Sequence, residues 1–413
     1  MDVNEIRKEV DPELPANNPR KQANLISKFF FAWLDPLIWT GYRRELKQED
    51  LYATPEAAKS QKLLKDFKTY WTFKHQKETE VRLWLALLQF FKVTVTLHGT
   101  LHLCEVLMFM AQAVLVGYLS QYFCEKNSLE EELTTLQNSN KSDLANSVED
   151  EIKLVTRNAF LYAAGIALLG IAQALIHAWA LFLSSILGMK IRVLLTAAIY
   201  DKSLHLSHST IGQLSIGHIV NLASNDVQRY DLGVDFAHMW WIFLVTLPLL
   251  VYLLWSEIGP SCLVGLGLVF VQPPLQYILG RLYTKLWLKS AKVTDKRVRV
   301  MNEIISGMRL IKMYAWEWAF HEYVKKIRKK ESNIITKASM IRGVNQAIFY
   351  SLLSLLGFIT FSMYTGLGNS LTPKKVFTVL SLYGVARFFF VRLLATGVLG
   401  ISEMWAATIR IEV

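Results

Sequence analysis

Cysteine and charge are both scarce in this sequence of 413 residues. It has only three cysteines, at positions 104, 124 and 262, with no CxxC pair, which excludes a disulfide scaffold, a zinc ribbon and an iron–sulfur site. Charged residues make up only 19% of the chain against 52% hydrophobic residues, and the mean hydropathy is +0.26. This composition excludes an ordinary soluble domain, so we expect a membrane protein.

The formal net charge is nevertheless +11, which raises the question of nucleic-acid binding. Lysine and arginine beside long apolar runs are more typical of cytoplasmic loops of membrane proteins, so we expect no nucleic-acid partner. Residues 1–82 are polar and mixed in charge, and they lack the basic-then-apolar start of a cleavable signal peptide. We therefore expect this region to stay in the cytoplasm.

Six apolar stretches are long enough to cross a bilayer as helices, which takes roughly 20 residues each. They are Leu83–Phe123, Ala159–Leu187, Leu232–Trp255, Pro260–Leu288, Gly343–Leu367 and Val376–Trp405. The amphipathic pattern continues into polar sequence over Gly188–Asp201 and Arg281–Met313, which indicates helices that project beyond the membrane. The sequence thus predicts an all-α membrane protein, with its membrane domain over residues 83–413.

The charges of the connections predict the orientation of these spans. The connection Cys124–Thr156 is rich in Asp and Glu, whereas Arg281–Arg342 is crowded with Lys and Arg, so the first is expected outside and the second inside. Both chain ends then lie in the cytoplasm. The only N-x-S/T sequon begins at Asn140, in the acidic extracellular loop, where we expect glycosylation.

The two cytoplasmic connections are expected to be long helical hairpins, each with a distinctive tip. Gly307–Trp318 holds aromatic side chains flanked by basic ones, and in the other hairpin Gly212-Gln213 leads into polar sequence up to Val227. Exposed aromatic residues with a charged rim are typical of a protein contact surface. Periodicity alone is equally consistent with solvated helix ends.

Four segments carry a resemblance to a known family. They are Asn24–Leu37, Gly217–Val227, Met301–Glu317 and Leu382–Arg387. In order and spacing, from about residue 20 to the end, the chain resembles the first transmembrane domain of ATP-binding-cassette exporters of class C. Within that class it is most similar to the short multidrug-resistance-associated type, which has no additional N-terminal membrane domain. The run Lys-Met-Tyr-Ala-Trp-Glu at Lys312–Glu317 is the most specific of the matching motifs.

The resemblance implies a six-helix type-1 exporter domain, an N-terminal lasso within residues 1–82, and a plasma-membrane location. It implies that the hairpin tips seat on nucleotide-binding domains, which bind ATP and Mg²⁺, and that a second transmembrane domain and small organic anions are further partners. The residues implied at the coupling sites are Gly212, Gln213, Tyr314, Ala315, Trp316 and Glu317. On physical grounds Phe29–Trp39 is too short to cross, Asp35-Pro36 is expected to break any helix there, and the segment should lie at the membrane interface.

The chain also departs from the family pattern. Its 413 residues contain neither a G-x-x-x-x-G-K-[ST] phosphate loop nor an L-S-G-G-Q-like signature, and Val413 follows the sixth span. We therefore expect no catalytic residue, no cofactor and no ATP hydrolysis in this chain alone. It is either a truncated or partial product or one piece of a pump.

Ionisable residues inside membrane spans are costly, so they are candidates for function. His98, His102 and Glu105 recur at i, i+4 and i+7 on one face of the first span. This spacing resembles a set of metal ligands, but we favour side chains that line a polar translocation cavity, with no metal.

Arg387 and Arg392 lie in the sixth span beside three consecutive phenylalanines. A guanidinium offers fixed charge and a bidentate fork to a carboxylate, phosphate or sulfate, and in the family the arginine of the Tyr-Gly-x-x-Arg run contacts anionic substrates. Arg387 is therefore the first candidate for substrate binding; its alternative is an internal ion pair with Glu105. Further aromatic candidates are Phe349, Tyr350, Trp240 and Trp241.

A chain with six spans of this kind is open to three classes of function, of which the sequence supports two. The first is the transmembrane domain of an ATP-driven exporter of amphipathic organic anions. The second is a truncated, non-transporting paralogue that associates with or regulates a full-length pump. The third, an ion channel with a voltage sensor, needs regularly spaced cations in the fourth span and a re-entrant filter before the sixth, and neither is present.

Overall fold

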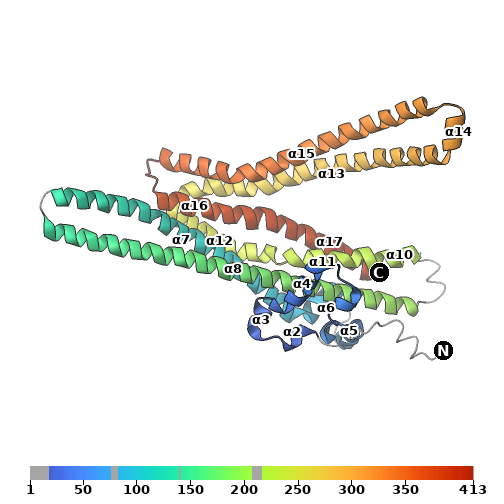
Figure 1. Cartoon of the computed structure of the whole chain (residues 1–413), viewed down its shortest axis with the longest axis horizontal. Helices are drawn as coiled ribbons and strands as arrows, with labels where there is room; N and C mark the ends of the chain where they lie inside the picture. Colours follow the sequence, from blue (N-terminus) through green and yellow to red (C-terminus); the bar gives the residue numbers. More distant parts are fainter. Residues whose placement is uncertain (1–17, 76–81, 139–140, 207–215, 413) are drawn as a thin grey trace. The chain divides into compact units, whose positions relative to one another are not determined.

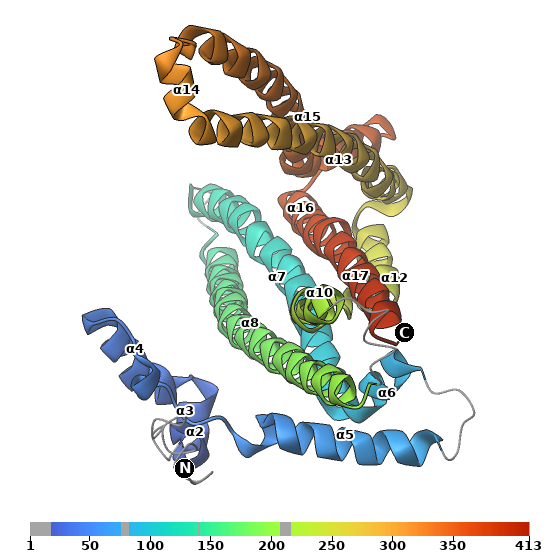
Figure 2. The ribbon, with the colours of Figure 1, turned by 90° about the vertical axis from the view of Figure 1, so that its right-hand side faces the viewer.

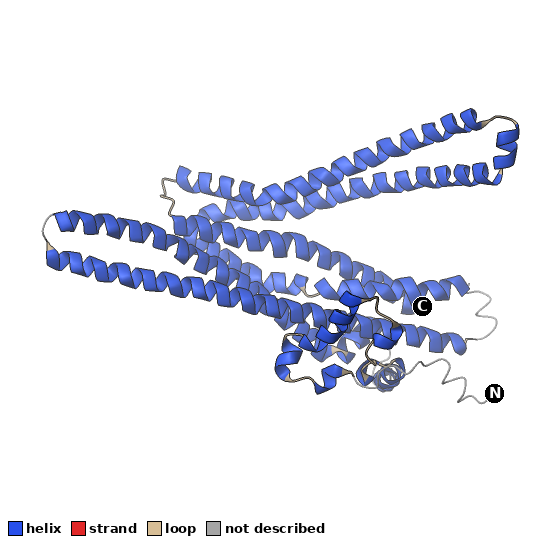
Figure 3. Cartoon of the chain, viewed as in Figure 1, coloured by secondary structure: helices blue, strands red, loops and turns tan. Residues whose placement is uncertain are grey.

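The computed structural model describes residues 18–75, 82–138, 141–206 and 216–412, and within these ranges every regular element is helical (Figure 3). Before the first long helix come short elements: α2 (Pro19–Gln22), α3 (Leu25–Phe29), η1 (Ala32–Leu34), α4 (Asp35–Arg43), η2 (Gln48–Asp50), η3 (Glu56–Ala58), α5 (Ser60–His75) and α6 (Leu83–Phe90). The long helices and their breaks follow: α7 (Lys92–Asn138), α8 (Ser142–Leu204), α10 (Ile216–Asn221), η4 (Leu222–Asp226), α11 (Val227–Phe236), α12 (Met239–Ile258), η5 (Gly259–Ser261), α13 (Cys262–Ser306), α14 (Met308–Met313), α15 (Glu317–Gly366), α16 (Pro373–Val385), η6 (Ala386–Leu393) and α17 (Leu394–Glu412).

The dipeptide Asp35-Pro36 lies at a helix boundary: no α-helix runs through it, and it begins α4, because proline in the first turn does not need its missing N–H. One expectation about local structure is wrong. The acidic segment 124–156 is not a loop: α7 continues to Asn138 and α8 begins at Ser142. Ion pairs at i, i+4 spacing support these helical extensions, with 3.5 Å between Lys126 and Glu130.

Five helical stretches within the described residues are long and apolar enough to cross a membrane. They are Lys92–Asn138, Asp143–Leu204, Gly217–Ser306, Glu317–Gly366 and Pro373–Glu412. The third is interrupted at η5, where Gly259 has a φ of +56° that favours glycine over any residue with a Cβ. This break separates α12 from α13.

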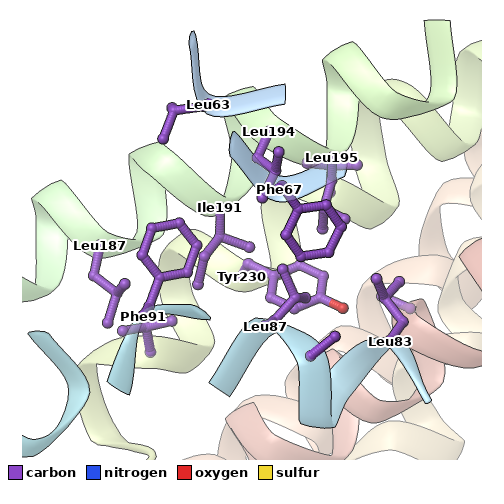
Figure 4. Close-up of a cluster of buried hydrophobic side chains, with 14 residues drawn as sticks. Leu63, Phe67, Leu83, Leu87, Phe91, Leu187, Ile191, Leu194, Leu195 and Tyr230 are labelled. Atoms are coloured by element: carbon purple, nitrogen blue, oxygen red, sulfur yellow. The ribbon is translucent and has the colours of Figure 1, made fainter. Parts of the chain in front are cut away.

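The chain divides into two compact units, and α7, α8, α12 and α17 contribute residues to both. The first unit comprises residues 1–105, 169–242 and 396–413. Its core, shown in Figure 4, packs apolar side chains of α5 and α6 against α8 and α11. The buried residues of this cluster are Leu63, Phe67, Leu83, Ala86, Leu87, Phe91, Leu187, Ile191, Leu194, Leu195, Val227, Tyr230, Val234 and Ala407.

The second unit comprises residues 106–168 and 243–395. Helices α13 and α15 run beside each other and are joined at one end by the short helix α14, as Figures 1 and 2 show. Near the other end, a Cβ on Gly265 would lie 2.0 Å from the Tyr383 hydroxyl oxygen, so the close approach of α13 to α16 requires glycine there. Tyr383 also hydrogen-bonds Thr360 of α15 at 3.1 Å, which ties three helices together.

Candidate functional site

Both arginines predicted to bind substrate, Arg387 and Arg392, lie in the π-helical segment η6. π-Helical turns are rare and occur frequently at functional sites. A second π-helical segment, η4, falls inside the polar motif of the first hairpin. Neither π-helical segment has a signal in the hydrophobic pattern, so sequence reasoning missed both.

Arg387 is surrounded by aromatic residues of α15. Its Nη1 donates to the backbone carbonyl oxygen of Tyr350 at 3.4 Å, and its guanidinium carbon lies 5.4 Å from the ring centroid of Phe349. Its Nε is buried and has no hydrogen-bond acceptor among the described residues. A buried donor without an acceptor costs about 1–3 kcal/mol, which a bound anion or a water would recover.

The pairing of Arg387 with Glu105, the alternative raised by the sequence, joins residues of different units and stays a prediction. Each of the two side chains has other partners in its own unit.

A cavity of about 370 Å³ lies beside η6 in the second unit. Its lining residues are Phe109, Gln112, Ala113, Val116, Ser381, Gly384, Val385, Phe388 and Phe389. The rings of Phe109 and Phe389 are 5.2 Å apart at 66°, and a Cβ on Gly384 would meet no atom within 4 Å. The cavity offers phenyl rings with two polar groups, the Gln112 amide and the Ser381 hydroxyl.

Sequence reasoning missed the α7 side of this cavity, although a signal was present. Phe109, Gln112, Ala113 and Val116 recur at i, i+3, i+4 and i+7, which places them on one helix face. The single polar residue on that otherwise apolar face could have marked it.

The polar residues of the first span form a buried network in the first unit. His98 and His102 approach each other at 3.1 Å between their Nε2 atoms, and His102 Nδ1 lies 3.1 Å from a carboxylate oxygen of Glu105. The other oxygen of Glu105 lies 2.9 Å from Nδ1 of His177 on α8. The proposed contact of these residues with substrate stays a prediction; within the described residues they bond one another.

The network continues to the turn between α11 and α12. There the ring of His238 lies 4.9 Å from that of His98, and His238 Nδ1 accepts a hydrogen bond from Trp241 Nε1 at 3.1 Å. His177 and His238 were missed by sequence reasoning, although both lie in predicted spans. The rule that singles out ionisable residues in spans would have found them.

A metal site requires three or more His, Cys, Asp or Glu side chains in suitable geometry. The described ranges contain no such group. In the described residues the two oxygens of Glu105 contact His102 and His177.

Trp240 and Trp241, predicted to contact substrate, line a different cavity of about 460 Å³ in the first unit. Its walls are largely apolar and include Trp84 and Trp405, whose rings are 5.7 Å apart at 66°. Among the predicted substrate residues, the arginines and Trp240–Trp241 therefore belong to separate units.

The second hairpin tip consists of α14 and the turn into α15. Tyr314 and Trp316 stack with ring centroids 5.2 Å apart at 24°, and they remain 58% and 52% exposed. Ala315 between them has a φ of +54°, an uncommon conformation for a residue with a Cβ. Lys312 and Glu317 pair across the turn at 2.9 Å. The tip therefore presents an aromatic stack on a defined turn.

Further along the hairpin, Glu331 of α15 ties α15 to α13. Its carboxylate accepts from Thr294 Oγ1 at 2.6 Å, from Arg297 Nε at 2.9 Å and from Arg328 Nη1 at 2.8 Å. These hydrogen bonds, that of Thr294 foremost and then that of Arg328, lower the pKa of Glu331 to about 2.

Three predicted sites lie outside the described residues. They are Gly212 and Gln213 of the first hairpin tip and Asn140 of the sequon.

Comparison with known proteins gives the class of this chain. Residues 96–388 match the ABC transporter transmembrane region, which is more than half of the chain. The chain belongs to this family.

Relatives in sequence include class C members. ATP-binding cassette sub-family C member 4 of Mus musculus is 34% identical over 374 residues, which cover 90% of this chain and 27% of that protein. The Homo sapiens member 4 is 32% identical over 402 residues, 96% of this chain and 28% of that protein. Sub-family C member 2 of Mus musculus is 29% identical over 404 residues, 90% of this chain and 26% of that protein. The resemblance to the class C, multidrug-resistance-associated branch is confirmed.

The chain spans about a quarter of the length of these curated relatives. It is a multi-pass, helical membrane region of the ABC transporter type.

Proposed function

We propose that this chain forms half of the substrate pathway of an ATP-driven exporter of amphipathic organic anions. The observation that carries the proposal is the buried Nε of Arg387, a charged donor without an acceptor among the described residues. An arginine fork pairs well with a carboxylate, sulfate or phosphate, and the pair gains strength where water is excluded.

The surroundings of Arg387 support an amphipathic ligand over a simple ion. The guanidinium is steadied by the Tyr350 carbonyl oxygen and the Phe349 ring. The cavity of about 370 Å³ is lined by Phe388 and Phe389 of η6, the residues that follow Arg387, though not by Arg387 itself. It has the size of a small organic molecule, and its phenyl rings suit flat apolar groups. Arg392, on the same π-helical segment, is a second candidate.

In this proposal, energy enters through the hairpin tips. Tyr314, Ala315, Trp316 and Glu317 dock on a nucleotide-binding domain, as do Gly212 and Gln213 of the other hairpin. That domain binds ATP and Mg²⁺, and a second transmembrane domain completes the pathway. The exposed stack of Tyr314 and Trp316 supports this role, because large aromatic side chains on a projecting turn are typical anchors of protein interfaces.

The proposed topology has six crossings in the plasma membrane. Residues 1–82 form a cytoplasmic lasso, both chain ends lie in the cytoplasm, and Asn140 is glycosylated outside. The break at Gly259–Ser261 supports six crossings, because it divides the stretch Gly217–Ser306 between α12 and α13.

Uptake into inside-out vesicles tests the proposal, with this chain expressed as part of a complete transporter. Arg387→Ala is expected to lower transport of organic anions at least tenfold and to spare neutral compounds. The reason is that a charge-assisted hydrogen bond from the guanidinium to an anion is worth more than about 1.4 kcal/mol, which corresponds to a factor of ten. Arg387→Lys should recover only part of the activity, because the planar fork is lost.

Arg281→Ala is the matched control, since Arg281 also lies over an aromatic ring, that of Tyr277 at 5.2 Å, but far along the chain from η6. It should leave anion uptake unchanged. Normal anion uptake by a normally expressed Arg387→Ala protein would remove Arg387 from the binding site. Lost expression of Arg387→Ala, rescued by Glu105→Gln, would point to the ion pair instead.

A further inference from the structure

The hydrogen bonds around Glu105 define one tautomer pattern for the state in which Glu105 is ionised and the histidines are neutral. Trp241 Nε1 can only donate, so His238 Nδ1 is bare and its proton is on Nε2. An ionised Glu105 can only accept, so in this state His102 and His177 both carry their proton on Nδ1. Nε2 of neutral His102 is then an acceptor, and it accepts a hydrogen bond from Nε2–H of His98.

One atom in this pattern stays unused. His98 is fully buried, at 0% exposure, and its Nδ1 has no hydrogen-bond partner among the described residues. With the proton of His98 on Nε2, its Nδ1 is an acceptor without a donor, which is tolerated better than a buried N–H without an acceptor. The geometry is therefore self-consistent with four neutral histidines and one carboxylate.

The charge of this arrangement is unbalanced. Within the described residues, the titratable groups that face the network are its own members. They are His98, His102 and Glu105 of α7, His177 of α8, and His238 of the turn between α11 and α12. Asp235, near His238 in sequence, is bonded by Ser184, and Cys104 is exposed. Four neutral histidines and one ionised Glu105 carry a net charge of −1 in a buried site. One proton neutralises this charge, whereas a second would leave an uncompensated positive charge.

We propose that Glu105 and its histidine partners form a binding site for a single proton. The proton enters at His177, whose side chain is 49% exposed, and makes it an imidazolium bonded to Glu105. The proton can be shared between His177 Nδ1 and the Glu105 oxygen that it contacts. It goes no further inward, because the other Glu105 oxygen faces His102 Nδ1, which already carries a proton.

The proton site borders a helix joint. His238 lies in the turn between Phe236, the end of α11, and Met239, the start of α12. Helix α7 packs tightly against this turn, because a Cβ on Gly99 would meet Trp241 at 2.8 Å and His238 Nδ1 at 2.9 Å.

The test is nitrogen NMR of the full chain, labelled with ¹⁵N-histidine, in lipid nanodiscs between pH 9 and pH 5. Single substitutions assign the signals of the nine histidines. At high pH we expect Nε2–H tautomers for His98 and His238 and Nδ1–H tautomers for His102 and His177. On acidification, one proton should enter the network, with the change at His177.

Glu105→Gln keeps the shape and removes the charge, so it should lower the midpoint of this proton uptake by at least about one pH unit, a tenfold weaker proton affinity. His321→Gln removes an exposed histidine of α15 outside the network and should leave the midpoint unchanged. If Glu105→Gln fails to assemble, His177→Gln gives the second readout, since it should abolish the first step of proton uptake. Unchanged uptake in both Glu105→Gln and His177→Gln, or an Nδ1–H tautomer of His98 at high pH, would overturn the proposal.

Discussion

Glu105 and Glu331 are both buried carboxylates, 4% and 2% exposed, yet they have opposite kinds of partners. Glu331 is held by Arg297, Arg328 and the hydroxyl of Thr294, between α13 and α15. Glu105 is held by two histidines, His102 of α7 and His177 of α8. The same acidic group therefore joins two helices in each unit, with partners of fixed charge in one case and titratable partners in the other.

The difference teaches what each joint is suited to. An arginine stays charged at every physiological pH, so the Glu331 joint keeps its charge balance and holds the hairpin firmly. Histidine is the side chain that is able to change charge near neutral pH, so the proton site that we propose would make the Glu105 joint the adjustable one. Three predictions test this contrast.

Glu331→Ala should give the largest effect. The change strands Arg297 between α13 and α15 without its counter-charge, and breaking a buried pair in this way typically costs about 3 kcal/mol. The loss should appear as faster proteolysis of the hairpin and a lower thermal unfolding midpoint of the chain in nanodiscs. Glu322→Ala removes an exposed carboxylate of the same helix, paired with Lys325, and should change neither readout. Equal effects of the two variants would contradict a special role for Glu331.

His177→Arg should convert the first unit to the behaviour of the second. The half-exposed position has room for a longer side chain, and a guanidinium would give Glu105 a permanent counter-charge. The chain should then take up about one proton fewer between pH 8 and pH 6 than the wild type, measured by potentiometric titration in weakly buffered nanodiscs. Tyr200→Arg adds a guanidinium at an exposed position of the same helix without removing a histidine, so it is the control and should leave the proton uptake unchanged. If both variants lose the same proton, Glu105 does not set the uptake.

The smallest expected effect is the response of the α13–α15 hairpin to low pH. Because hydrogen bonds lower the pKa of Glu331 from 4.5 to about 2, its stabilisation is complete above the unfolded value and is lost as the pH falls toward 2. The separation of spin labels on exposed positions of α13 and α15 should stay constant from pH 9 to about pH 5 and broaden only below about pH 4.5. Glu331→Gln should be insensitive in the acid range. Broadening of the wild type near pH 6 would show that another group controls the hairpin.

Much of the fold could be predicted from the sequence, because apolar runs of bilayer length and helical periodicity are strong signals. The long apolar helices, the extension of α13 to Ser306 and the aromatic turn after it all follow from that pattern. The helical extensions 124–138 and 142–156 did not, since acidic residues read as a loop when their i, i+4 pairing with lysine is ignored.

The candidate site was predicted less completely. Arg387 stood out because an arginine in an apolar span is costly and because it falls on the Tyr-Gly-x-x-Arg run; Glu105 stood out for the first of these reasons. The π-helical turn at Ala386–Leu393 leaves no trace in residue type, because it depends on how neighbouring helices pack. The partnership of Glu105 with His177 joins residues 72 positions apart, which one sequence without relatives cannot reveal.

The hairpin of α13 and α15 has a mechanical consequence. Helix α15 has 50 residues, so at 1.5 Å per residue it is a rod of about 75 Å. With Glu331 binding it to α13, the pair bends less than either helix would alone, and a rotation of about 5° at one end displaces the other by about 6 Å. The hairpin is therefore a lever, because a rotation of a few degrees at its tip suffices to shift side chains at its opposite end by more than the diameter of a water molecule.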